Sequence, residues 1–111
     1  MASYFEQLRD PRWQKKRLQI MERANFACEK CGDSKTTLNV HHGLYWKGNA
    51  PWQYPDCTLW CLCEPCHEEV EALLEEIREY VGMLNPEQLK RLLEFACETY
   101  HEVFVPPECE K

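Results

Sequence analysis

The chain has 111 residues, of which 44% are hydrophobic and 29% are charged, and it carries a net charge of −6. No apolar run approaches the roughly 18 residues of a membrane-spanning helix, and the first residues, MASYFEQLRDPRW, lack the basic-then-apolar pattern of a signal peptide. We therefore expect one domain over residues 1–111, in a cytoplasmic protein of bacterial or phage-like type with reduced thiols and no membrane contact.

A basic helix is predicted over residues 10–24. Asp10 and Pro11 form a favourable helix start, an N-cap followed by proline, and Trp13, Ile20 and Met21 fall on one helical face. Residues 1–47 hold nine Lys or Arg against five Asp or Glu, a net charge of +4, whereas residues 48–111 hold four against fourteen, a net charge of −10. This uneven charge favours a basic, anion-binding face with an acidic face behind it. An ordinary surface with a charged helix at each end is the alternative, because it would give the same uneven charge.

The middle of the chain predicts an antiparallel hairpin. Residues 36–42, TTLNVHH, are β-branched and alternating, and residues 57–62, CTLWCL, form the second strand. A loop of about fourteen residues joins the strands, and a loop of that length in a small domain is usually functional or else indicates a misassigned element.

Two helices follow the hairpin. The first is predicted from residue 65 or 66 to residue 81, and its apolar face consists of Val70, Leu73, Leu74, Ile77 and Val81. The second is predicted over residues 85–104, with an inward face of Leu89, Leu92, Leu93, Ala96 and Tyr100. The predicted fold class is α+β, mainly helical.

Four of the eight cysteines form two Cys-x-x-Cys pairs that flank the hairpin: Cys28, Cys31, Cys63 and Cys66. This spacing is typical of a tetrahedral structural zinc site, in which four thiolates leave no position open to a substrate. Two disulfides are the alternative, and they fit the expected reducing compartment poorly. Each of the others is expected to be a small buried residue or an inert thiol: Cys57, Cys61, Cys97 and Cys109.

A second group of metal-binding side chains accompanies the cysteines. His41 and His42 are neighbours on a predicted strand, so they point to opposite sides, and one can hold a metal while the other acts as a base. His67 directly follows Cys66, and Glu71 lies on the same helical face four residues later. His67 and Glu71 can therefore chelate one divalent ion.

Together, the segments CEKCG, LNVHH and LWCLCEPCH resemble the HNH endonuclease family, in the branch whose ββα-metal fold is pinned by a four-cysteine zinc site. The likeness covers residues 24–71, within a motif core that reaches residue 81. It implies a hairpin-plus-helix core with an additional helix at each end. It also implies a metal-dependent DNA endonuclease that hydrolyses phosphodiester bonds with Mg²⁺ or Mn²⁺, nicking one strand with low sequence specificity.

Carried over residue by residue, the resemblance implies that His41 and His67 bind the catalytic ion and that His42 is the general base. In colicin-type members a histidine follows four residues after the helix histidine, and here that position is Glu71, whose oxygen ligand favours Mg²⁺ or Mn²⁺ over zinc. The central asparagine of the family falls at Thr58, which is expected to support the site through a hydrogen bond.

The two halves of the chain predict different partners. The basic half supplies candidate phosphate contacts to DNA: Arg12, Lys15, Lys16, Arg17 and Lys47. The acidic half, including the segment HEEVEALLEEIREY, offers a surface for a protein partner or a homodimer. The alternative function is a non-catalytic zinc module that binds nucleic acid or protein.

Overall fold

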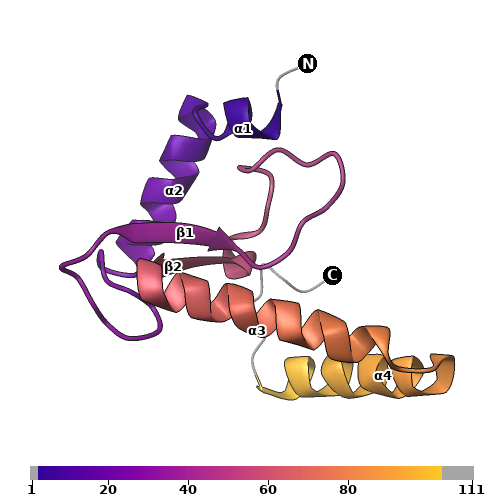
Figure 1. Cartoon of the computed structure of the whole chain (residues 1–111). Helices are drawn as coiled ribbons and strands as arrows, with labels where there is room; N and C mark the ends of the chain where they lie inside the picture. Colours follow the sequence, from indigo (N-terminus) through magenta and orange to yellow (C-terminus); the bar gives the residue numbers. More distant parts are fainter. Residues whose placement is uncertain (1–2, 104–111) are drawn as a thin grey trace. The chain divides into compact units, whose positions relative to one another are not determined.

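The computed structural model describes residues 3–103, with side chains described as far as residue 99. The fold class is α+β, as predicted. Its elements in chain order are α1 (Tyr4–Gln7), α2 (Pro11–Arg23), β1 (Leu38–His42), the 3₁₀ helix η1 (Asp56–Thr58), β2 (Leu59–Cys63), α3 (Glu64–Gly82) and α4 (Pro86–Val103) (Figure 1). The chain divides after His67 into two compact units, and α3 runs through the division. The prediction of a single domain stays a prediction.

Helix α2 confirms the predicted N-terminal helix. Its N-cap is Asp10, whose carboxylate accepts a hydrogen bond from the backbone N–H of Arg12 at 2.8 Å. Trp13, Ile20 and Met21 are buried on one face. The preceding short helix α1 was not predicted, because four residues capped by Ser3 carry no periodic signal.

The chain leaves α2 through residues in the left-handed backbone region. Asn25 and Phe26 both have φ of 55°, which ends the helix and turns the chain toward the first cysteine pair. Within that pair, Gly32 has φ of 83° and its N–H donates to the carbonyl of Cys28 at 2.9 Å. The Cys-x-x-Cys-Gly turn thus depends on glycine for its closing residue.

The predicted antiparallel hairpin is confirmed. β1 pairs with β2 in a register that sets Leu38 opposite Cys63 and His42 opposite Leu59. β2 begins two residues later than predicted, because residues 56–58 form η1 instead. In that turn the backbone N–H of Thr58 donates to the carbonyl of Pro55 at 3.0 Å.

The hydrophobic core lies between α2 and the hairpin, which Figure 1 shows against each other. Its buried members are Trp13, Ile20, Met21, Tyr54, Leu59 and Cys61. Burying each large side chain stabilises the fold by about 1.5–3 kcal/mol, so this core holds α2 and both strands in place. Cys61 is buried as expected, whereas Cys97 is exposed and Cys109 lies outside the described residues. Cys57 is half-buried and disulfide-bonded, so the expectation of a small buried residue or an inert, reduced thiol is wrong for it.

Helices α3 and α4 confirm the two predicted C-terminal helices, and they run in opposite directions (Figure 1). Asn85 caps α4, since its side chain accepts from the N–H of Gln88 at 2.9 Å while the Gln88 side chain accepts from the N–H of Asn85 at 3.0 Å.

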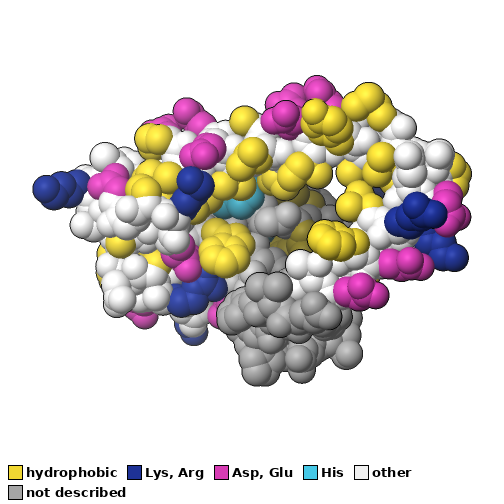
Figure 2. All heavy atoms as spheres, turned by 90° about the horizontal axis from the view of Figure 1, so that it is seen from below, with side chains coloured by type: hydrophobic (Ala, Val, Ile, Leu, Met, Phe, Trp, Pro, Cys, Tyr) yellow, Lys and Arg dark blue, Asp and Glu magenta, His cyan; other side chains and the backbone are white. Residues whose placement is uncertain are grey.

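The prediction that the apolar face of α4 points inward is wrong. Leu89, Leu92 and Leu93 are exposed, as are Leu73 and Ile77 of α3. Figure 2 shows that hydrophobic side chains reach the surface of the molecule. No side chain of residues 68–99 is buried. Across the described part of the chain, every helix falls short of the length or apolar character needed to cross a membrane.

Candidate metal centre and histidine pocket

The four predicted zinc ligands come together. Cys28 and Cys31 lie in the turn after α2, and Cys63 and Cys66 straddle the junction at which β2 passes directly into α3. Their sulfur atoms all lie within 4.8 Å of one another. Four sulfurs placed about 2.3 Å from one ion form a tetrahedron with edges of about 3.8 Å, and the Sγ atoms of Cys31 and Cys63 are 3.6 Å apart. The cluster therefore fits a zinc ion.

The pKa values of two thiols in the cluster, Cys28 and Cys66, are shifted in opposite directions. Burial raises the pKa of Cys28, but backbone N–H donors, including those of Cys31 and Lys30 at 3.4 Å, outweigh it and lower that pKa to about 6. A hydrogen bond with the Cys63 thiol and burial raise the pKa of Cys66 to about 12. Clustered thiolates repel one another, and a divalent cation removes that repulsion. The donor chemistry thus agrees with the geometry.

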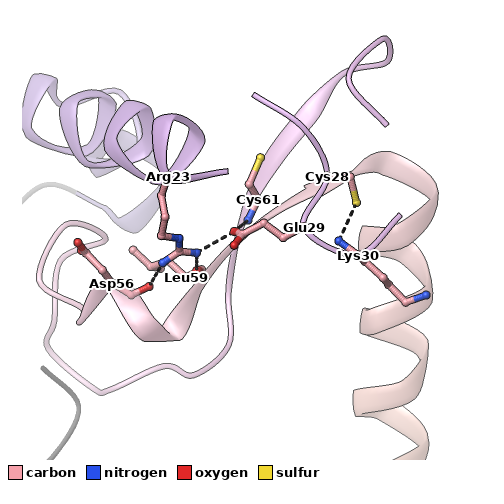
Figure 3. Close-up of polar contacts among 7 residues, drawn as sticks. All are labelled: Arg23, Cys28, Glu29, Lys30, Asp56, Leu59 and Cys61. Carbon is pink, nitrogen blue, oxygen red and sulfur yellow. Dashed lines mark hydrogen bonds and ion pairs between the residues drawn. The ribbon is translucent and has the colours of Figure 1, made fainter. Parts of the chain in front are cut away.

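An arginine clamp fixes the first cysteine pair to the hairpin (Figure 3). Arg23, the last residue of α2, donates to the carboxylate of Glu29 at 2.7 Å and to the carbonyls of Asp56 at 2.8 Å and Leu59 at 2.6 Å. Glu29 in turn accepts from the N–H of Cys61 at 2.8 Å, and its own N–H donates to the carbonyl of Cys61 at 2.8 Å. Glu29 lies between the two cysteines of the pair, so the clamp positions their turn beside β2.

His41, His67 and Glu71 also come together. The rings of His41 and His67 are 5.2 Å apart, centroid to centroid. Glu71 follows His67 by one turn of the continuous helix α3, and one potential ligand atom of each of the three residues lies within 4.8 Å of the others. Two imidazoles and a carboxylate form a group that could hold a divalent metal ion.

His42 occupies an aromatic box on the other side of the hairpin. Its ring stacks on Trp13 at 4.9 Å and on Tyr45 at 5.6 Å, and Tyr54 meets it edge-on at 5.1 Å. The side chain is only 5% exposed. His41 contacts α3 while His42 contacts α2, so the two histidines point to opposite sides as predicted.

One hydrogen bond sets the tautomer of His42. Its Nε2 lies 3.1 Å from the carbonyl oxygen of Pro51. A carbonyl only accepts, so Nε2 carries the proton and Nδ1 of the neutral ring is the basic nitrogen. Burial lowers the pKa of His42 below 6.5, against the raising effect of the Pro51 carbonyl, and this favours the neutral ring.

A cavity of about 440 Å³ joins the three histidines. It lies within the first unit, and its lining also includes Tyr4, Arg17, Asn39, Tyr45 and Glu64. Asn39 and Glu64 were not predicted as site residues. Asn39 lies two residues before His41 and therefore shares its strand face. Glu64 lies three residues before His67 and therefore shares its helix face. The strand and helix periodicities could thus have predicted both residues.

Thr58, which was predicted to support the site, contacts the end of β1 through its backbone. Its carbonyl accepts from the N–H of Gly43 at 2.7 Å, directly after the histidine pair. A Cβ on Gly43 would meet this carbonyl oxygen at 3.1 Å, so the close approach favours glycine there. The Thr58 hydroxyl donates to the carbonyl of Pro55 at 2.7 Å, within its own turn.

The predicted phosphate contacts differ in their surroundings. Arg17 lines the histidine cavity. Arg12 pairs with Asp10 at 2.9 Å and lies 4.1 Å over the ring of Trp52, and Lys16 forms an ion pair with Asp56. Lys15 and Lys47 are exposed. The structure therefore brings only Arg17 of this group into the cavity.

No protein-family model, curated protein or solved structure matches the chain.

Proposed function

We propose that the chain is a metal-dependent DNA endonuclease of the HNH type. The observation that carries the proposal is a tautomer-fixed histidine, His42, in one cavity with His41, His67 and Arg17. General-base catalysis needs a neutral imidazole, and phosphodiester hydrolysis needs a nearby cation. The two requirements meet in this cavity.

His41, His67 and Glu71 are the residues that would hold the catalytic ion, Mg²⁺ or Mn²⁺. When bound, the ion supplies Lewis-acid stabilisation of the charge that develops on the phosphate and on the leaving oxygen. The four-cysteine site has no open position and would hold a structural zinc.

His42 would act on the attacking water. Its Nδ1 takes one proton while the water oxygen forms a bond to phosphorus, and the bond from phosphorus to the 3′ oxygen breaks. The 3′ oxygen gains a proton from solvent, which leaves 3′-hydroxyl and 5′-phosphate ends. The Pro51 carbonyl holds the ring through Nε2 during this transfer.

Arg17 would bind the phosphate that is cleaved, since it is the predicted phosphate contact that lines the cavity. Lys15 and Lys47 add sequence-independent attraction to the DNA backbone. One such site per chain cuts one strand per encounter, so a nick with low sequence specificity is the proposed product.

Incubation with supercoiled plasmid and Mg²⁺ or Mn²⁺ tests the proposal. We expect the wild type to produce open circles and His42→Ala to be slower by at least about 100-fold. Because His42 is buried, zinc content and circular dichroism of the variant must match those of the wild type. If folded wild type leaves the plasmid intact with either ion, the chain is instead a non-catalytic zinc module.

A further inference from the structure

We propose that the histidine cavity takes an unpaired nucleotide whose base stacks on Tyr45, so that single-stranded DNA is the preferred substrate class. This inference rests on the proposed function and specifies its substrate. It comes from the arrangement of aromatic rings around His42, which general-base chemistry alone does not require.

The first observation is a stack of three rings that ends at the surface. Trp13 and His42 lie 4.9 Å apart with an interplanar angle of 27°, and His42 and Tyr45 lie 5.6 Å apart with an angle of 29°. Trp13 and His42 are buried, whereas Tyr45 is 63% exposed. A base placed on the exposed face of Tyr45 would continue the stack, with the Tyr45 ring between it and the proposed general base.

The second observation concerns the next residue, Trp46, whose exposed ring also stacks on a buried aromatic side chain. Trp46 stacks on the buried ring of Tyr54 at 5.6 Å with an angle of 19°, and it is 41% exposed. The Tyr54 hydroxyl accepts from the N–H of Trp46 at 2.9 Å and donates to its carbonyl at 3.2 Å. Buried partners thus hold both rings in place, which lowers the entropy that stacking would cost.

A cationic group accompanies the first of these rings. Arg17 lines the cavity that Tyr45 also lines, whereas Arg12 pairs with Asp10 and lies over a different ring, Trp52. An exposed aromatic ring that shares a cavity with an arginine can bind a single strand through base stacking and phosphate attraction. The cavity of about 440 Å³ falls within the range of about 300–1,000 Å³ that is usual for small-ligand sites.

Base stacking distinguishes single strands from duplexes. In a duplex each base is covered on both faces by its neighbours, so a protein ring cannot stack on it without disrupting the helix. An unpaired base offers its face at no such cost. Tyr45 and Trp46 should therefore add affinity for a single strand and none for a duplex, whereas phosphate contacts attract both.

Fluorescence anisotropy with a labelled oligonucleotide tests the inference. The zinc-loaded protein is titrated without added Mg²⁺ or Mn²⁺ into one sequence, as a single strand and as a duplex. The wild type should bind the single strand more tightly. Tyr45→Ala should weaken single-strand binding about tenfold and leave duplex binding unchanged, while Tyr45→Phe should keep the wild-type affinities. Tyr80→Ala is the matched control, because Tyr80 is 62% exposed on α3 and is outside the cavity lining.

Tyr45→Leu keeps apolar cover over His42 without a flat ring, and it should show the same selective loss as Tyr45→Ala. The inference would be overturned if the wild type bound the duplex more tightly, or if Tyr45→Ala and Tyr45→Leu weakened the binding of both DNA forms equally. Neither result would contradict the proposed nuclease, which plasmid nicking tests separately. Selective single-strand binding by a protein that never nicks would support the stacking site and contradict the proposed nuclease.

Discussion

The chemistry open to His42 is set by residues that lie far from it in the sequence. Trp13 supplies a stacking partner from α2, and Pro51 supplies the carbonyl that holds Nε2. From the sequence, the alternation of a strand was enough to predict that His41 and His42 diverge. The aromatic box was not predictable, because it depends on how α2 and the long loop close over β1.

Glu71 is the only carboxylate in the group with His41 and His67 that could hold a metal ion, and its charge should matter for binding the proposed catalytic ion. We expect Glu71→Gln to weaken Mn²⁺ binding by at least about tenfold, because the amide keeps the shape of the side chain but removes its negative charge. Titration of the zinc-loaded protein with Mn²⁺, followed by electron paramagnetic resonance, measures the affinity.

Glu75→Gln provides the control for that titration. Glu75 is an exposed carboxylate one turn farther along α3, outside the group of potential ligands. Equal Mn²⁺ affinity in the two variants would remove Glu71 from the site.

Among the secondary-structure elements, the turn that carries Cys28 and Cys31 depends most on one side chain. Glu29 links it to β2 through Cys61 and to α2 through Arg23. Removing the carboxylate leaves the N–H of Cys61 and the guanidinium of Arg23 each short of an acceptor.

We therefore expect Glu29→Ala to lower the free energy of unfolding of the zinc-loaded protein by about 1–3 kcal/mol. Glu29→Gln should cost less, since its amide oxygen still accepts from Cys61. Urea denaturation measures both, with Glu22→Ala on the exposed face of α2 as a control expected to change stability by less than about 0.5 kcal/mol. A Glu29→Ala variant as stable as Glu22→Ala would show that the clamp contributes nothing.

The elements themselves were largely predictable from the sequence. Caps at Asp10 and Asn85 marked the starts of α2 and α4, and alternation marked β1. The start of β2 was missed because a hydrogen-bonded turn at Thr58 competes with the strand. The inward face of α4 was predicted wrongly, since periodicity indicates that a helix has an apolar side but not that anything covers it.

Within the described residues, the buried side chains all lie at or before Cys66. The core of α2 and the hairpin is fully formed there, whereas no side chain of residues 68–99 is buried. Backbone hydrogen bonds with few buried contacts around them open at a low free-energy cost.

This contrast predicts uneven hydrogen exchange. Amides in the part of α4 up to residue 99 should exchange at least about tenfold faster than those of β1 and β2. Exchange followed by mass spectrometry or nuclear magnetic resonance on the zinc-loaded protein gives both rates. Equal protection of α4 and β2 would mean that something covers α4 in solution, and a concentration dependence of that protection would identify a second copy of the chain.

The structural zinc should hold together the turn after α2 and the junction between β2 and α3. We expect Cys66→Ser to lose zinc and with it the cooperative unfolding of the hairpin, since zinc binding in small domains supplies on the order of 10 kcal/mol of folding free energy. Cys97→Ser changes an exposed free cysteine and should retain one zinc per chain by elemental analysis. Retention of zinc by Cys66→Ser to the same extent would contradict the four-cysteine site.

The most direct test of the proposed nuclease activity is chemical rescue of His42→Gly on supercoiled plasmid with Mn²⁺. The variant removes the imidazole and leaves a space between Trp13 and Tyr45 that a free imidazole can enter. The wild type should nick the plasmid, the variant should be inactive, and added imidazole should restore nicking by the variant alone. Wild type that does not nick, or His42→Gly that nicks at the wild-type rate without imidazole, would contradict the role of His42 as the base.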